Sequence, residues 1–168
     1  AILFLLAASL RMGVLPLNLT YMDAPELRRD SGLLMRLFPM ASAFMLIARL
    51  PAGIGMMPGL APSLLRILAL LAAVYSSLMW LTRKTEYEAR PFWTVALASF
   101  GVISALNGLP EASRAWGMAL LLVGSLLFLF DPPVRRIRFL IVIGMGGLLG
   151  LPYTPLISGW DGILNQGL

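Results

Sequence analysis

The sequence predicts an all-α integral membrane protein with about six transmembrane helices, of which the first and the last are broken by glycine and proline. Of the 168 residues, 59% are apolar and only 12% are charged, whereas a typical soluble domain is about 25% charged. The mean hydropathy is +0.86. Apolar stretches of about 20 residues, the length of helix that crosses a bilayer, recur along the whole chain. A soluble protein of this size would need more polar residues to cover its surface.

Six candidate spans follow one another with short connections between them. They are Ala1 to about Thr20, Leu33–Leu50, Ser63–Leu81, Phe92–Leu109, Ala115–Phe130 and Phe139 to about Ile157. No tract resembles a soluble domain, so we expect residues 1–168 to form a single membrane domain. The chain starts inside an apolar run, without the basic residues that open a signal peptide. We therefore expect it to be a fragment of a longer subunit.

Residues that begin or end helices agree with these boundaries. Ser63 follows a proline and is expected to cap the third span with its hydroxyl. Pro91 is expected at the first position of the fourth span, where its missing N–H costs nothing. The sequence Asp131-Pro132-Pro133 is expected to end the fifth span, because proline cannot continue a helix.

The basic residues alternate from one connection to the next. The net charge of +5 comes from twelve arginines and a single lysine against eight acidic residues. The connections after the first, third and fifth spans carry eight basic residues: Arg28, Arg29, Arg83, Lys84, Arg90, Arg135, Arg136 and Arg138. The connections after the second and fourth spans, with the span ends beside them, carry three: Arg49, Arg66 and Arg114. The positive-inside rule places the more basic side in the cytoplasm, and it explains these residues without a nucleic acid partner. We expect the bacterial inner membrane or an equivalent energy-transducing membrane.

The chain contains no cysteine and no histidine. The first absence excludes disulfides, iron–sulfur clusters and thiolate metal sites. The second removes the usual axial haem ligand, zinc ligands and the commonest proton carrier, together with hydrolytic triads built on histidine. We therefore predict no catalytic residue, no metal site and no cofactor. Whether the chain belongs to an enzyme stays open, since it is at most a non-redox subunit of an ion-pumping oxidoreductase.

Two proline breaks and two arginines are candidates for an ion pathway. Pro16 and Pro152, each in a Leu-Pro pair, remove backbone hydrogen bonds within or near the membrane. Transporters build ion sites from such helix breaks. Arg11 and Arg36 lie inside predicted spans, where a charge is costly unless it is paired or faces a wet cavity. The alternatives are structural kinks at the prolines and arginines that extend to the headgroups.

Three arginines and the tryptophans are expected to lie at the membrane surface. Arg135, Arg136 and Arg138 are candidates for binding anionic lipid headgroups, or act only as determinants of topology. The tryptophans lie near the ends of spans, which is typical of an aromatic belt: Trp80, Trp93, Trp116 and Trp160.

Three stretches resemble a known family in their order and spacing. They are Leu10-Arg11-Met-Gly-Val-Leu-Pro16-Leu-Asn18 with Asp23-Ala24, Ser31-Gly-Leu-Leu34 and Leu46-Ile-Ala-Arg49; Glu86-Tyr-Glu-Ala-Arg90 with Thr94 to Gly101; and Ser125-Leu-Leu-Phe-Leu129 with Gly150-Leu-Pro152 and Trp160-Asp161. This order resembles the antiporter-like membrane subunits of respiratory complex I and of multisubunit cation/proton antiporters. The resemblance covers nearly the whole chain but only about a third of a full family subunit.

The resemblance also shows what this chain lacks. Family members carry lysines and histidines along the middle of the membrane. Here the lysine of the first broken helix corresponds to Arg11, a histidine falls on or beside Met35, next to Arg36, and a lysine falls near Ala41. In the fifth span, two histidines and a lysine of the family correspond to Trp116, Leu120 and Gly124. The proton relay that the family implies is therefore almost absent, and arginine does not readily release a proton.

The function expected from these observations is that of a diverged antiporter-like membrane subunit. We expect it to act as a scaffold, or as a weakly conducting element of an ion pathway, in a larger membrane energy-converting complex. An alternative is an active proton- or cation-translocating subunit in which water, hydroxyl groups and fixed arginine charges replace the relay. A second alternative is a structural lipid- or pigment-associated subunit, which the absence of histidine disfavours. The expected partners are membrane lipids and other membrane subunits.

Overall fold

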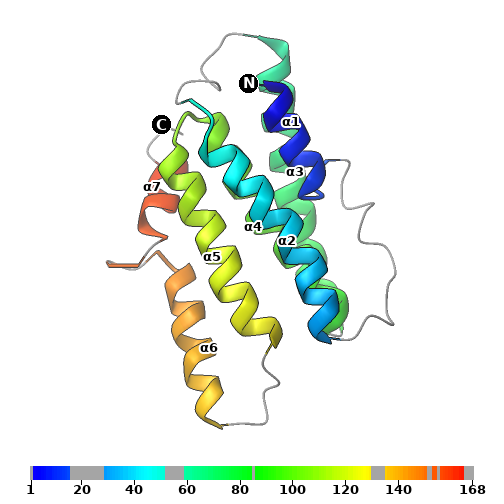
Figure 1. Ribbon diagram of the computed structural model, residues 1–168, viewed down its shortest axis with the longest axis vertical. Helices are drawn as coiled ribbons and strands as arrows, with labels where there is room; N and C mark the ends of the chain where they lie inside the picture. The colour runs from blue at the N-terminus through cyan, green and yellow to red at the C-terminus, as the bar shows by residue number, and fades with distance from the viewer. Residues whose placement is uncertain are drawn as a thin grey trace.

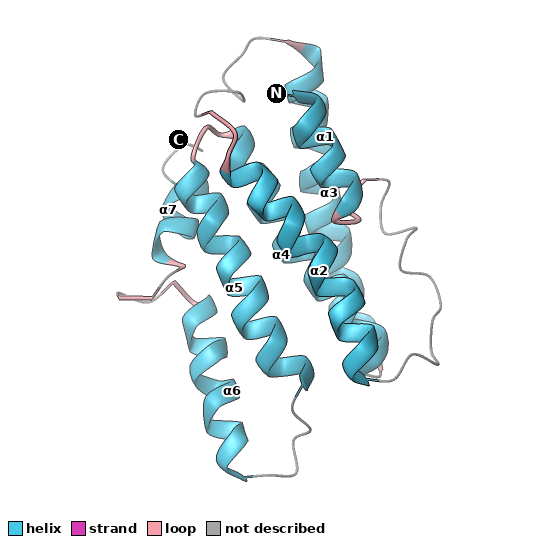
Figure 2. Cartoon of the chain, viewed as in Figure 1, coloured by secondary structure: helices cyan, strands magenta, loops and turns pink. Residues whose placement is uncertain are grey.

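The structure, a computed structural model, describes residues 2–15, 29–51, 59–84, 86–129, 135–150, 153–154 and 156–164. This part of the chain is all α-helical (Figures 1 and 2). Its helices are α1 (Ile2–Arg11), α2 (Arg29–Ala48), α3 (Leu60–Thr82), α4 (Glu86–Leu106), α5 (Pro110–Leu129), α6 (Arg135–Leu148) and α7 (Ile157–Leu164). The all-α class is as predicted. Two helices in the described part, α3 and α4, are long and apolar enough to cross a membrane.

The four long helices, α2 to α5, form an antiparallel bundle (Figure 1). The helix α4 packs between α3 and α5, and α2 packs on α5. The short helix α1 packs mainly on α2, while α6 and α7 pack on α5. One end of the bundle therefore carries the start of α2, the turn from α3 to α4, the end of α5 and the start of α6. The opposite end carries the end of α2, the start of α3 and the turn from α4 to α5.

The centre of the bundle is α4. An 18-residue stretch within Glu88–Leu106 is 83% buried, and Val95, Ala98, Ser99 and Val102 are completely covered. The buried apolar and small residues of α4 itself lie on all sides of the helix, which is the pattern of a helix in the interior of a protein. The neighbouring helices are therefore arranged around α4.

The contact between α3 and α4 is made by small side chains. Ala69, Ala72, Ala73 and Ser76 of α3 are all buried, and they recur every three or four residues, so they share one face of the helix. Small residues let two helix backbones approach closely, as in many helix pairs within membranes. Because α3 packs mainly on α4, its opposite face has few neighbours in the described chain.

Phe44 of α2 fills a notch that two glycines leave open. A Cβ atom added to Gly117 of α5 would lie 2.9 Å from the Phe44 ring, and one added to Gly101 of α4 would overlap the same ring. Phe44 itself is buried. Glycine at both positions thus allows α2, α4 and α5 to meet around a single aromatic side chain.

Two predicted helix starts are wrong. The helix α3 begins directly after Gly59 without a capping side-chain hydrogen bond, and the Ser63 hydroxyl instead donates to the Gly59 carbonyl oxygen at 3.2 Å. The helix α4 begins at Glu86, so Pro91 lies inside it rather than at its first position. The acidic residues Glu86 and Glu88 gave the indication that was missed, because carboxylates are favoured at the positive N-terminal end of a helix.

Glycines with positive φ end three of the helices. They are Gly13 after α1 (φ 74°), Gly108 after α4 (φ 75°) and Gly150 after α6 (φ 67°). After α1, the Gly13 N–H donates to the Leu10 carbonyl at 3.1 Å, and the N–H of the next residue donates to the Ser9 carbonyl at 3.0 Å. This pair of bonds is the Schellman motif, which satisfies the last carbonyls of a helix and needs a left-handed residue.

The first and the last predicted spans are interrupted. In each, the helix ends shortly before a glycine with positive φ, Gly13 after α1 and Gly150 after α6. The helix α1 stops at Arg11, and the sixth predicted span is helical only to Leu148, before α7 begins at Ile157. Pro16 and Pro152, which were predicted to break these spans, lie outside the described residues. With 10 and 14 residues, α1 and α6 are each shorter than the roughly 20 residues that cross a bilayer.

Candidate functional site

Arg11, the first candidate for the ion pathway, is the last residue of α1, and its side chain is exposed. The helix α1 stops part-way along the bundle in Figure 1. No carboxylate of the described residues forms an ion pair with Arg11. Its positive charge is favourable at the negative C-terminal end of α1. Arg11 therefore faces outward, and it does not point into a polar interior of the described bundle.

The other predicted site residues lie wholly or partly outside the described structure. The backbone of Arg36 is in α2, and the backbones of Arg135, Arg136 and Arg138 form the first turn of α6. The four side chains are outside the described part, as are the whole of residues 16 and 152. The structure thus brings none of these candidates together with Arg11 through a described contact.

The positions at which the resemblance implies a relay in the fifth span are filled by packed residues. Trp116, Leu120 and Gly124 are all buried on α5. A Cβ added to Gly124 would lie 3.1 Å from the Trp93 ring and 3.8 Å from Leu37. Protein interiors of this density leave no room for a chain of water. In the described part, this face of α5 forms core contacts with α4 and α2.

The carboxylates and the lysine whose side chains the structure describes lie at its surface. Glu88, Glu111, Asp161 and Lys84 are exposed. No group of three or more possible metal ligands occurs among the described residues. A relay needs titratable groups within hydrogen-bond or one-water reach of each other. The described helices contain no buried series of such groups.

Two arginines bind the carbonyl ends of neighbouring helices. Arg66 of α3 donates through Nη2 to the Leu106 carbonyl at the end of α4, at 2.9 Å. Arg114 of α5 donates through Nη2 to the Ala48 carbonyl at the end of α2, at 3.2 Å, and through Nη1 to Glu111 at 2.7 Å. The last carbonyls of a helix have no partner within it, and a cation is favoured there. Both arginines therefore fasten helix ends at the less basic end of the bundle.

The turn between α3 and α4 holds a second set of charged contacts. The guanidinium carbon of Arg83 lies 5.1 Å from the centre of the Phe92 ring, within the range of a cation–π contact. Arg83 Nη1 is also 3.8 Å from a Glu88 carboxylate oxygen. Tyr75 meets the same phenyl ring edge-on at 6.3 Å. Lys84 follows Arg83 and is exposed.

Arg90 is the buried charge that the sequence analysis missed. It was assigned to the connection between spans, but it lies in the second turn of α4 and is only 8% exposed. Burying a charge is costly unless other groups compensate it. The helix-forming run that starts at Glu86 was the available signal, because it carries Arg90 into the buried part of α4.

The aromatic belt prediction is wrong for two tryptophans. Trp93 is buried and Trp116 is only 1% exposed. Trp116 packs against Phe100 at 4.9 Å and Trp160 at 5.2 Å between ring centres, and its Nε1–H donates to the Gly159 carbonyl at 3.2 Å. Of the four tryptophans, Trp80 alone is exposed, and it lies in the last turn of α3.

This aromatic cluster also fixes the break between α6 and α7. The Trp160 Nε1–H donates to the carbonyl of Leu148, the last residue of α6, at 3.1 Å. A Cβ added to Gly150 would overlap the Trp160 ring. Two indole N–H groups therefore bind backbone carbonyls on the two sides of the break, and these bonds tie α7 to α5 and to the end of α6.

The outer face of α3 is left uncovered by the described helices. An 18-residue stretch within Leu60–Thr82 has a mean hydropathy of 1.9, yet only 28% of it is buried. The exposed apolar residues of the helix recur with helical spacing and define what we call the outer face of α3: Leu60, Leu64, Ile67, Leu68, Leu70, Leu71, Val74, Leu78 and Leu81. Soluble monomers rarely expose contiguous apolar patches of this kind.

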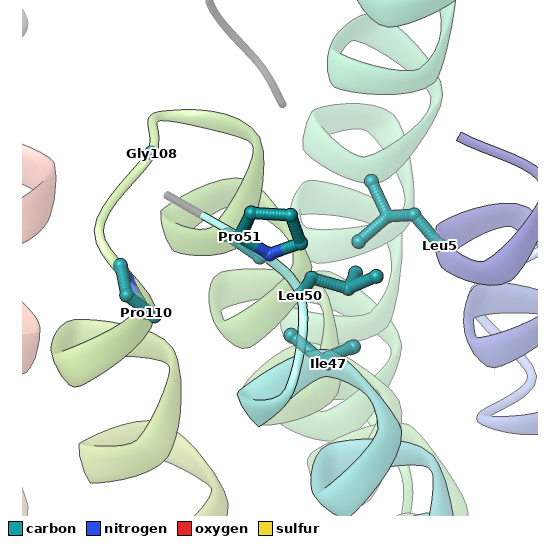
Figure 3. A pocket seen from close by; sticks show the side chains of 7 residues that line it. Leu5, Ile47, Leu50, Pro51, Gly108 and Pro110 are labelled. Atoms are coloured by element: carbon teal, nitrogen blue, oxygen red, sulfur yellow. The ribbon is translucent and has the colours of Figure 1, made fainter. Parts of the chain in front are cut away.

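A small pocket lies where α1, α2 and the turn between α4 and α5 meet (Figure 3). It is lined mainly by apolar side chains, among them Leu5, Ile47, Leu50 and Pro51. Its volume is about 10 Å³, which is close to the minimum that holds one water molecule. The pocket is too small for a substrate or a cofactor.

Comparison of the chain with protein-family models, curated proteins and solved structures gives no match.

Proposed function

We propose that the chain is an integral membrane scaffold element of a larger energy-converting complex, derived from an antiporter-like subunit. In this proposal α2, α3, α4 and α5 span the bilayer, while α1 and the α6–α7 pair belong to two broken helices. The basic connections lie in the cytoplasm of a bacterial or equivalent energy-transducing membrane. Other membrane subunits are the partners.

The single observation that carries the membrane assignment is the outer face of α3. A helix of 23 residues rises about 35 Å, which is enough to cross a hydrocarbon core of about 30 Å. Complete burial of such a leucine or isoleucine side chain contributes roughly 1.5–3 kcal/mol, and in water each partly exposed side chain of this face would forgo part of that. In lipid, the same face is solvated by acyl chains.

The one charge within α3 is compatible with this environment. Arg66 lies in the second turn of α3, and its guanidinium binds the Leu106 carbonyl at 2.9 Å. Charged side chains in membrane helices are normally paired with other groups or with backbone carbonyls. The hydrogen bond at the end of α4 thus supports a position near the membrane surface.

The scaffold role, as opposed to pumping, is supported by the apolar filling of α5. Trp116 and Leu120 occupy positions at which the resemblance implies histidines, and both are buried among apolar side chains. The outward position of Arg11 separates its charge from this core. Trp116 and Leu120 hold helices together, and neither side chain offers a group that exchanges protons.

The experiment that tests this function is deletion of the gene in the source organism, followed by separation of membrane complexes on native gels. We expect one large membrane complex to be lost and to return when the full chain is supplied. Complementation with Arg11→Gln should restore both the complex and its ion pumping. If the wild-type chain migrates with no larger complex, the scaffold role is wrong. Loss of pumping in an assembled Arg11→Gln complex would instead favour the ion-pathway alternative.

A further inference from the structure

We propose that the C-terminal end of α3 binds an anionic phospholipid, with the phosphate between Arg83 and Lys84 and the acyl chains along the outer face of α3. This inference rests on the proposed insertion of α3 into the membrane. It adds a specific lipid class and a site on a connection that the sequence analysis treated only as a determinant of topology.

The two basic side chains lie where a headgroup would meet the apolar face. Arg83 directly follows the last helical residue, Thr82, and Lys84 comes next. Leu78 and Leu81 of the outer face lie within the last turn and a half of the same helix. A phospholipid presents its charge at one end of its acyl chains, so a cationic pair at one end of an apolar strip matches its chemistry.

The position of Arg83 is set by its neighbours, while Lys84 is less constrained. Arg83 lies over the Phe92 ring and 3.8 Å from Glu88, and its side chain remains 37% exposed. Glu88 offsets part of its charge. In formal charge, Glu86 and Glu88 balance Arg83 and Lys84. The site therefore depends on the exposed Lys84 lying next to Arg83 at the end of the outer face.

The shape of the outer face favours lipid over another helix. Helix pairs in membranes meet through small residues that let the backbones approach. In α3 the small buried residues, such as Ala69 and Ala73, are on the face that packs on α4. The outer face carries leucine, isoleucine and valine instead. Bulky branched side chains suit flexible acyl chains, which can fill the spaces between them.

The test uses Leu78→Trp in a Trp80→Phe chain as the reporter. Leu78 lies on the outer face of α3, whereas Trp80 follows Ser76 by four residues and shares the side of the helix that packs on α4. The full chain is reconstituted in phosphatidylcholine vesicles that contain either phosphatidylglycerol or phosphatidylcholine with bromine near the ester end of the acyl chains. Bromine quenches tryptophan fluorescence on contact, and subtracting the signal of Trp80→Phe isolates the reporter. We expect brominated phosphatidylglycerol to quench this reporter at several-fold lower mole fraction than brominated phosphatidylcholine.

Three variants make the test specific. Lys84→Gln should reduce this preference about fivefold, the effect of one basic side chain near an anionic surface, and Arg83→Gln/Lys84→Gln should abolish it. Arg49→Gln, which removes an exposed charge at the opposite end of the bundle, should leave it unchanged. Glu88→Gln should increase it, because the substitution removes the negative charge beside Arg83.

The outcomes separate this inference from the proposed function. Equal quenching by both brominated lipids shows that the reporter on the outer face lies in the membrane but that the anionic site does not exist. A preference that persists in Arg83→Gln/Lys84→Gln also overturns the site. Absence of quenching by either lipid overturns the insertion of α3, and the lipid site with it.

Discussion

At the scale of single residues, two arginines of this chain bind the ends of neighbouring helices. Arg66 and Arg114 each bind the last carbonyls of another helix, which is a role that charge counting does not reveal. The two partners are 40 and 66 residues away in sequence. No local pattern connects residues so distant, so the sequence predicted only which side of the membrane these charges occupy.

Arg66→Met should destabilise the bundle, because it leaves the Leu106 carbonyl without its hydrogen bond. The expected loss is about 1–3 kcal/mol, the cost of an unsatisfied buried polar group. Thermal unfolding in detergent, followed by tryptophan fluorescence, measures the change. Arg49→Met is the matched control, since Arg49 is exposed and surface substitutions usually change stability by less than about 0.5 kcal/mol. Equal unfolding temperatures for the two variants would show that the carbonyl contact does not stabilise the fold.

Two glycines of the same region should respond in opposite directions to alanine. Gly150→Ala forces a side chain into a left-handed conformation, which costs about 1–2 kcal/mol, and its Cβ overlaps Trp160. Gly147→Ala lies in helix α6 with nothing within 4 Å of the added Cβ, so it should gain about 0.5–1 kcal/mol. The same unfolding assay distinguishes them. A neutral Gly150→Ala would refute the role of Trp160 in fixing the break.

At the scale of helices, the sequence predicts which segments are helical better than where they begin. Apolar length and the breaks near Gly13 and Gly150 are local properties, and both breaks are present in the described structure. Helix starts depend on competition between caps, so Ser63 and Pro91 were placed wrongly. The tryptophans were assigned by their distance from span ends, but burial depends on the neighbouring helices. Trp116 is buried because α7 returns to cover α5.

The arrangement of the helices predicts that Lys84 and Glu111 lie on opposite sides of the membrane. Both side chains are exposed, and they lie at opposite ends of the bundle. The chain has no cysteine of its own, so Lys84→Cys and Glu111→Cys each introduce a unique thiol. In sealed vesicles, an impermeant maleimide should label Lys84→Cys only from the cytoplasmic side and Glu111→Cys only from the other side. Labelling of both thiols from one side would contradict the proposed topology.

At the scale of the whole molecule, the bundle is built around α4 and leaves α3 at its edge. The sequence shows that both helices are apolar, but not which of them is central, because the buried helix α4 is the less apolar of the two (mean hydropathy 1.3 against 1.9 for α3). Small residues on one face of α3 and on α4 determine the pairing. The consequence is a continuous outer face of leucine, isoleucine and valine, on which the membrane assignment depends.

A nitroxide scan of the outer face of α3 tests this assignment most directly. Single cysteines at Ile67, Leu71, Val74 and Leu78, each carrying a spin label, are measured in reconstituted vesicles for collisions with oxygen and with a water-soluble nickel chelate. A label at Glu111 provides the aqueous reference. The membrane assignment predicts high oxygen and low nickel accessibility at the four positions, with the greatest depth near Leu71. Nickel accessibility at these positions as high as at Glu111 would show that α3 faces water, and the account of this chain as a membrane protein would be wrong.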